Sequence, residues 1–336
     1  MGSVTCVTLH SQHIAQSSTA ATNCSSASPI RTSVEIMEQL RHRRVRVLKR
    51  VSKSSRIPAA EKLGETLRQV IDNPDCVDKW IDLLLFTFSC FGVPGQRGGK
   101  RHISSLASKI NAAVASFPST SPSVCHPPQP AKLSQSPDNM AARVSSKLEE
   151  GDIRGTIRLA ASEDTMAPYD DVTVAALRTK HPARATSETL PPTPNSDACL
   201  CLQEADIMAA IKSFVPGSAG GPDGLRPQHL KDLISASAGD AGVRLLTRLT
   251  EFSNLCLTGH VPADIQPVFC GASLCALNKK DGGIRPIAVG STLCRLVAKA
   301  ACKVVKTKLA LQFLQIQLGF GVPRAIEAAA HAVGRA

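Results

Sequence analysis

The chain has 336 residues, enough for two ordinary domains or for one domain with extended tails. Its 39 Lys and Arg residues exceed its 27 Asp and Glu residues, and the resulting net charge of +12 favours an anionic partner such as nucleic acid. The 12 cysteines include no C-x-x-C pair, so their spacing predicts neither a zinc ribbon nor a disulfide framework.

The composition also bears on the cellular compartment. The chain starts without a basic region followed by an apolar run, and its most apolar stretch is shorter than the ~20 residues that span a bilayer. We therefore expect an intracellular protein of the nucleus or the cytoplasm that is neither secreted nor inserted in a membrane.

The beginning of the chain predicts a tail and then a basic segment. Residues 1–33 are rich in Ser, Thr and Ala without a period, which predicts a disordered tail. Residues 34–117 open with a run of cations that is either a helix or arm on nucleic-acid phosphates, a nuclear-import signal, or a solvated flexible run. The candidate nucleic-acid contacts in this run are Arg41, Arg43, Arg44, Arg46, Lys49 and Arg50.

Three amphipathic helices are predicted after this basic run. Pro58 stands near the start of the first helix, where proline is tolerated. Apolar residues recur at helical spacing from Val77 to Phe88, the strongest such pattern in the chain, and again from Ile103 to Phe117. The segment 34–117 is therefore predicted to be helical after its basic start.

Proline divides the remainder of the chain. Residues 118–139 and residues 181–198 are rich in Pro and predict two extended linkers. Residues 140–180, between these linkers, return to helical spacing and predict a helical segment. The last segment, residues 199–336, carries the two motifs on which the functional interpretation depends.

The first motif is a glycine-rich loop that opens a helix. Backbone amides at such a position can bind phosphate, but the carboxylate of Asp223 would repel one. We therefore expect a structural turn at Gly221, Pro222, Asp223 and Gly224, which lets the backbone approach either a template strand or the core.

The second motif is a β-hairpin. Apolar runs at Val268–Leu277 and Ile284–Val289 flank an Asp-Gly turn, in which glycine tolerates the positive φ that a tight turn requires. Lys279, Lys280 and Arg285 are predicted near the tip, where they either suit a polyphosphate or are simply solvated.

A basic helix is predicted directly after the hairpin. Ser291 or Thr292 is its expected N-cap, and apolar residues recur at helical spacing up to Val305. Arg295 and Lys299 on this helix are further candidate nucleic-acid contacts.

These stretches together resemble reverse transcriptases of non-LTR (LINE-like) retrotransposons. The segment 277–289, LNKKDGGIRPIAV, is similar to their fingers hairpin, and the segment 213–231 is similar to the start of their polymerase domain. The pattern from Trp80 to Phe86 resembles the helical region that precedes that domain. The segment 317–331 resembles a stretch before the first catalytic motif, although Arg324-Ala325 departs from the usual glycines.

The resemblance implies a mainly α fold with one β-hairpin (α+β), part of the fingers of a right-hand polymerase. It implies that Lys279, Lys280 and Arg285 contact a nucleoside triphosphate, that RNA and DNA are partners, and that complete family members use Mg²⁺. The metal-binding aspartates of the family find no match here, since no Asp follows Asp281 and no Ala-Asp-Asp occurs.

We therefore expect the part of such a polymerase that precedes its catalytic palm. This chain is expected to have no catalytic residue, no metal site and no cofactor, and not to polymerise DNA alone; whether it is an enzyme at all stays open. Without a palm to pack on, apolar faces around Val268–Val289 are expected to be exposed. The alternatives are a non-catalytic, basic nucleic-acid-binding protein and a coding remnant without selected function, and the oligomeric state is left open.

Overall fold

The computed structural model describes eight ranges: 32–42, 46–93, 105–118, 137–149, 151–161, 165–168, 170–181 and 200–313, together with Arg324, Glu327, Ala330, His331 and Val333. Several predictions concern other residues and lie outside this description. They are the tail at 1–31, most of the two Pro-rich linkers at 119–136 and 182–199, the contacts Arg43 and Arg44, and nearly all of the segment 317–331.

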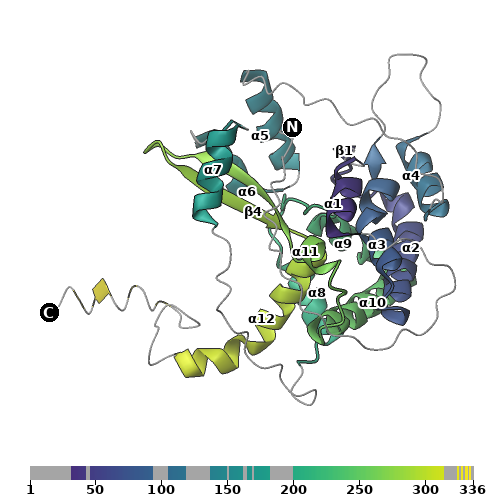
Figure 1. Cartoon of the computed structure of the whole chain (residues 1–336). Coiled ribbons are helices and arrows are strands. Elements are labelled where there is room, and N and C mark those ends of the chain that lie inside the picture. Colours follow the sequence, from purple (N-terminus) through teal and green to yellow (C-terminus); the bar gives the residue numbers. More distant parts are fainter. Residues whose placement is uncertain are drawn as a thin grey trace.

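The described part of the chain is mainly helical with two small antiparallel sheets (Figure 1). This confirms the predicted α+β class at that level. The helices are α1 (Ser33–His42), α2 (Lys53–Asp72), α3 (Val77–Cys90), α4 (Leu106–Ala115), α5 (Pro137–Glu149), α6 (Ile153–Ala161), α7 (Asp171–Lys180), α8 (Glu204–Lys212), α9 (Pro227–Leu233), α10 (Gly239–Leu257), α11 (Gln266–Phe269) and α12 (Thr292–Phe313), with a 3-10 turn η2 at Ala236–Ala238. The strands are β1 (Arg46–Val47), β2 (Gly92–Val93), β3 (Ala272–Asn278) and β4 (Ile284–Gly290).

The helices predicted from amphipathic patterns pack their apolar faces together and form the hydrophobic core. In α2 the buried positions include Ala59, Leu63, Leu67 and Val70, three or four residues apart, so one face of the helix packs inward. This face packs along α10 and against α3 and α4. Pro58 lies inside α2, five residues after its first residue, rather than at its start.

An aromatic cluster joins the beginning of the chain to its end. The ring of Trp80 lies 5.4 Å from Phe252 and 5.6 Å from Phe269, in tilted and edge-on arrangements that aromatic rings prefer. The indole N–H of Trp80 donates to the carbonyl of Pro74 at 2.8 Å, so the buried ring keeps no unpaired donor. One hydrophobic core therefore extends across the predicted boundary between segments 34–117 and 199–336.

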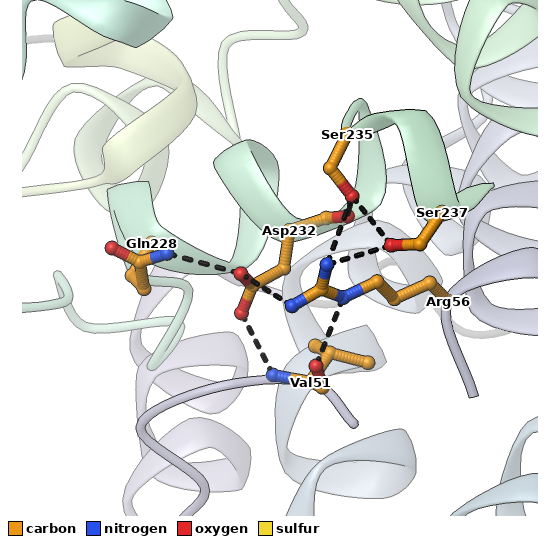
Figure 2. A network of polar contacts seen from close by, with 6 residues as sticks. All are labelled: Val51, Arg56, Gln228, Asp232, Ser235 and Ser237. Carbon is orange, nitrogen blue, oxygen red and sulfur yellow. Dashed lines mark hydrogen bonds and ion pairs between the residues drawn. The ribbon is translucent and has the colours of Figure 1, made fainter. Parts of the chain in front are cut away.

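A buried ion pair makes a second connection between these segments (Figure 2). Arg56 Nη2 lies 3.0 Å from Asp232 Oδ1, and the two side chains are 15% and 6% exposed. The guanidinium also donates to the hydroxyls of Ser235 and Ser237, while Asp232 Oδ2 accepts the backbone N–H of Val51. Because both charges are hydrogen-bonded on several sides, the pair holds the start of α2 against α9 without leaving a buried charge unpaired.

His229 ties the basic segment to α9. Its Nδ1 accepts the backbone N–H of Arg226 at 3.2 Å, so its Nε2 carries the proton and donates to the carbonyl of Leu48 at 2.8 Å. Burial lowers the pKa of His229 to about 4, because the charged imidazolium is disfavoured away from water. Residues around Leu48 are thus part of the folded body.

The β1–β2 sheet is a correction to the prediction of a single hairpin. Arg46 pairs with Val93, and Val47 pairs with Gly92. Each strand has only two residues, too few for an alternating pattern to be recognised in the sequence. The helices α2 and α3 also lie between the two strands along the chain. The basic segment is accordingly a helix, α1, followed by a short paired strand.

Candidate functional site

The β3–β4 hairpin forms as the sequence predicts. Seven residue pairs join the strands, from Ala272↔Gly290 to Asn278↔Ile284, although Val268 lies in α11 instead of in β3. At the turn the N–H of Lys279 donates to the carbonyl of Gly283, and Gly282 takes a φ of +80°. A residue with a side chain would be strained there, which explains the glycine in the Asp-Gly signal.

The tip of the hairpin presents the predicted cations to solvent. Lys279, Lys280 and Arg285 are all exposed, and Arg285 pairs across the ladder with Leu277. Arg285 is therefore held by the strand backbone while its guanidinium remains accessible, an arrangement that suits a phosphate-bearing ligand.

A segment from the middle of the chain covers the hairpin. Residues 165–167 lie along the outer edge of β3, where Ala167 N–H donates to the carbonyl of Ala276. Leu177 of α7 packs against Leu274 and Ala276 in a small cluster of its own, and Figure 1 shows α7 lying across the hairpin. The expectation of exposed apolar faces is therefore wrong for Leu274 and Ala276, which are 7% and 5% exposed.

The glycine-rich loop is a tight turn at the base of the hairpin. The N–H of Gly224 donates to the carbonyl of Gly221 at 3.0 Å, with Pro222 in the second position, where its fixed φ suits a turn. A Cβ at Gly221 would lie 2.5 Å from the carbonyl oxygen of Gly290, so only glycine permits this approach. Of the two predicted roles, approach to the core is the one observed.

Asp223 is the buried charge of this turn. Its carboxylate accepts the backbone N–H of Leu225 and the hydroxyl of Ser291, each at 3.3 Å. Burial nevertheless raises the pKa of Asp223 to about 6, while these hydrogen bonds and the charge of Arg295 act in the opposite direction. The carboxylate faces the base of the hairpin and is not available to a bound phosphate or metal ion at the surface.

Ser291 and Thr292 stand at the start of α12 and also form hydrogen bonds to the glycine-rich loop. The carbonyl of Ser291 accepts the N–H of Arg295, which places Ser291 at the start of α12 as predicted. Its side chain donates to Asp223, and the hydroxyl of Thr292 donates to the carbonyl of Leu225. The side chains thus join the two motifs to each other.

Arg295 and Lys299 lie on α12 beside the same loop. Arg295 Nη2 donates to the carbonyl of Ala219 at 2.6 Å and to Thr292 Oγ1 at 2.9 Å. Both cations lie over the ring of Phe214, at 5.8 Å and 5.3 Å from its centroid, a favourable cation–π arrangement. Partial burial lowers the pKa of the Arg295 guanidinium. Arg295 is chiefly a structural clamp, whereas Lys299 remains exposed.

The structure does not bring all the candidate residues together. The tip cations and the Gly221–Gly224 turn lie at opposite ends of the seven-residue strands, roughly 20 Å apart at ~3.3 Å per residue. In the basic segment Arg46 and Arg50 are exposed, and Lys49 donates to Ser146 of α5. Arg41 lies in α1.

Sequence reasoning missed two features near the hairpin base. One is Phe214, the platform for both cations, and the other is a contact between Cys270 and Cys294. Neither is visible in residue spacing, because each joins positions that are at least 24 residues apart and meet only in the fold.

No metal centre or membrane span is apparent in the described ranges. Within them, no group of three or more His, Cys, Asp or Glu side chains is placed to hold a metal ion. A search of the same residues for a helix of the length and apolarity of a transmembrane span also finds none.

Comparison with known proteins identifies no relative. The chain matches no protein-family model, no curated protein and no solved structure.

Proposed function

We propose that this chain is the fingers portion of a reverse transcriptase of the non-LTR retrotransposon type. In this proposal it contacts nucleic acid and an incoming nucleoside triphosphate, and it does not polymerise DNA by itself. Mg²⁺ serves complete members of that family, but the described residues include no set of carboxylates that fits such an ion.

One observation carries the proposal. The two sequence motifs on which the resemblance rests are far apart along the chain, yet they pack together through buried contacts. Ser291, after the hairpin, donates to Asp223 of the loop, and Thr292 donates to the carbonyl of Leu225. Two motifs that resemble segments of one family, in the same order, and also form one structural unit support a common function for both.

Binding of the triphosphate is assigned to the hairpin tip. Arg285 offers two parallel N–H donors to phosphate oxygens, and Lys279 and Lys280 add mobile positive charges. All three side chains are exposed, so a ligand can approach them from solvent.

The test is equilibrium binding of a fluorescent deoxynucleoside triphosphate to the full chain. We expect Arg285→Ala to weaken binding by about tenfold or more, since a charge-assisted hydrogen bond contributes ~1.5–3 kcal/mol. Arg68→Ala is the matched control, because Arg68 is a half-exposed arginine on α2 whose ion pairs with Glu65 and Asp72 lie at the surface. Equal affinity of the Arg285→Ala variant and the unmodified chain would refute the nucleotide site.

A second candidate is a non-catalytic, basic nucleic-acid-binding protein. It is favoured by Arg46 and Arg50, which are exposed on a segment that β1 and His229 anchor to the body. The same binding experiment separates the two candidates when it is repeated with single-stranded RNA. Loss of RNA affinity in a doubly substituted R46A/R50A variant, with no effect of Arg285→Ala on the triphosphate, would favour this second function.

A further inference from the structure

The base of the hairpin brings two cysteines together. Cys270 directly follows α11, and Cys294 lies in the first turn of α12. The last pair of the β3–β4 ladder is Ala272↔Gly290. Ala272 comes two residues after Cys270, and Gly290 comes four residues before Cys294. The backbones at Gly271 and Gly290 also meet, which holds the two cysteine-bearing turns side by side.

The two thiols are neighbours at the hairpin base and differ in exposure. They lie near enough for each to alter the ionisation of the other, and both are free cysteines, not joined in a disulfide. Cys270 is exposed, whereas Cys294 is half-buried. The neighbouring Cys294 thiol stabilises a thiolate at Cys270 and lowers the pKa of Cys270 to about 7, while Cys270 and burial together raise the pKa of Cys294. This is the combination that makes one thiol nucleophilic and the other a proton-bearing neighbour.

We propose that Cys270 and Cys294 are a reversible dithiol–disulfide pair, in which Cys270 attacks a small-molecule disulfide such as glutathione disulfide and Cys294 resolves the adduct. The inference does not depend on the proposed polymerase relationship. It rests on the juxtaposition of the two thiols at the hairpin base.

The chemistry balances in two thiol–disulfide exchanges. The Cys270 thiolate attacks one sulfur of glutathione disulfide, forms a mixed disulfide and releases one glutathione thiolate, which takes up a proton. Cys294 then loses its proton to solvent and attacks Cys270 Sγ, which releases the second glutathione and leaves the Cys270–Cys294 disulfide. Two cysteine thiols are oxidised, and one glutathione disulfide is reduced to two thiols.

Other nearby thiols are less suited to either role. Burial raises the pKa of Cys256 to about 12, so it stays protonated near neutral pH. Cys275 donates to the carbonyl of Ile287 across the hairpin, which directs it away from the base. The new bond would join α11 to the turn of α12 that carries Arg295, and would therefore restrain the contact between hairpin and loop.

Trypsin separates the two cysteines for detection. Cleavage yields a peptide of residues 249–279, which holds Cys270 with Cys256 and Cys275, and a peptide of residues 281–295, which holds Cys294 alone. After treatment of the full chain with glutathione disulfide, we expect these peptides to be linked, with a mass about 2 Da below their sum. Fragmentation should place the bond at Cys270, and dithiothreitol should reverse it.

Substitution tests the two roles. Cys294→Ser should leave glutathione attached to Cys270, and Cys270→Ser should leave the 281–295 peptide unlinked. Cys302 of α12, which is also exposed, is the internal control, and we expect Cys270 to react about tenfold faster than Cys302 at pH 7 because the neighbouring Cys294 favours the Cys270 thiolate. Oxidation should raise the melting temperature of the unmodified chain but not of the Cys294→Ser variant. Absence of the linked peptide, a bond to Cys256 or Cys275, or equal reactivity of Cys270 and Cys302 would overturn the proposal.

Discussion

Asp223 is a single residue whose surroundings are determined by the fold and not by its neighbours in the sequence. In the sequence it is an acid in a glycine-rich loop, a position that normally faces water. In the structure Gly221 and Pro222 turn the backbone so that the carboxylate lies inside, against the hydroxyl of Ser291. That partner is 68 residues away along the chain, so its presence could not be read from the loop.

Asp223 should make the stability of the protein fall as pH rises from about 4 to about 6. Its pKa is about 6 in the folded state against 3.8 for an ordinary Asp, so the folded chain holds a proton in this range that the unfolded chain has released. Asp223→Asn removes this dependence. We expect the variant to gain up to about 3 kcal/mol relative to the unmodified chain between pH 4 and pH 7, at 1.36 kcal/mol per pKa unit.

The measurement is urea unfolding of both proteins across that pH range. His229 acts in the opposite direction, because its pKa of about 4 lies below the ordinary 6.5, so its contribution is complete above pH 6.5 and is lost as the pH falls toward 4. His229 is present in both proteins, so its effect cancels in their difference. A difference that stays constant with pH would show that Asp223 is not a source of the pH dependence.

Among the secondary-structure elements, the hairpin has strands and a turn that the sequence predicted well. The segment that packs on it was not predicted. Two apolar runs and the Asp-Gly turn between them predicted both strands, whereas nothing in residues 165–181 predicted that this segment would cover the hairpin. The reason is that the described part of this segment contributes one buried apolar side chain, Leu177, together with the backbone hydrogen bonds that Thr165 and Ala167 make to β3. One such contact produces no recognisable pattern in the sequence.

Leu177→Ala should release this cover. Leu177 is 3% exposed, and loss of a buried leucine side chain typically costs 2–5 kcal/mol. Because the cluster is small, we expect about 2 kcal/mol, which would speed exchange of the Ala167 and Asn278 amide hydrogens by ~30-fold. Val172→Ala on the same helix is the control, since Val172 is 78% exposed and its truncation should leave exchange unchanged. Unaltered exchange in the Leu177 variant would mean that α7 does not hold the edge of β3.

At the scale of the whole molecule, the prolines suggested separate segments, and the core joins them. Helices of segment 34–117 pack directly on helices of segment 199–336, chiefly α2 on α10. Figure 1 shows these elements in one body, with the hairpin and α7 extending from it. The Arg56–Asp232 pair and the Trp80–Phe252 contact both cross between the segments.

The segment 200–336 should therefore not fold by itself. Removal of α2 and α3 would expose Phe252, Phe269 and the inner face of α10, and large exposed apolar patches lead to dye binding and aggregation. We expect this fragment to bind a hydrophobic dye strongly when expressed alone, and much less when co-expressed with residues 1–118. A cooperative unfolding transition of the isolated fragment at the midpoint of the full chain would contradict the shared core. A full chain without any cooperative transition would favour the coding remnant.

The amino-acid sequence by itself determined the helices with a strong apolar stripe, the hairpin and its turn, and the exposure of the tip cations. These features depend on neighbours within a few residues, through helical spacing, through short apolar runs beside a turn, and through the backbone freedom of glycine. The tertiary structure alone decided the burial of Asp223, the use of Ser291 and Thr292 to hold the loop, the meeting of Cys270 and Cys294, and the covering of the hairpin by α7. Each of these joins positions separated by tens of residues, and such contacts arise only when the apolar faces of distant helices close into one core.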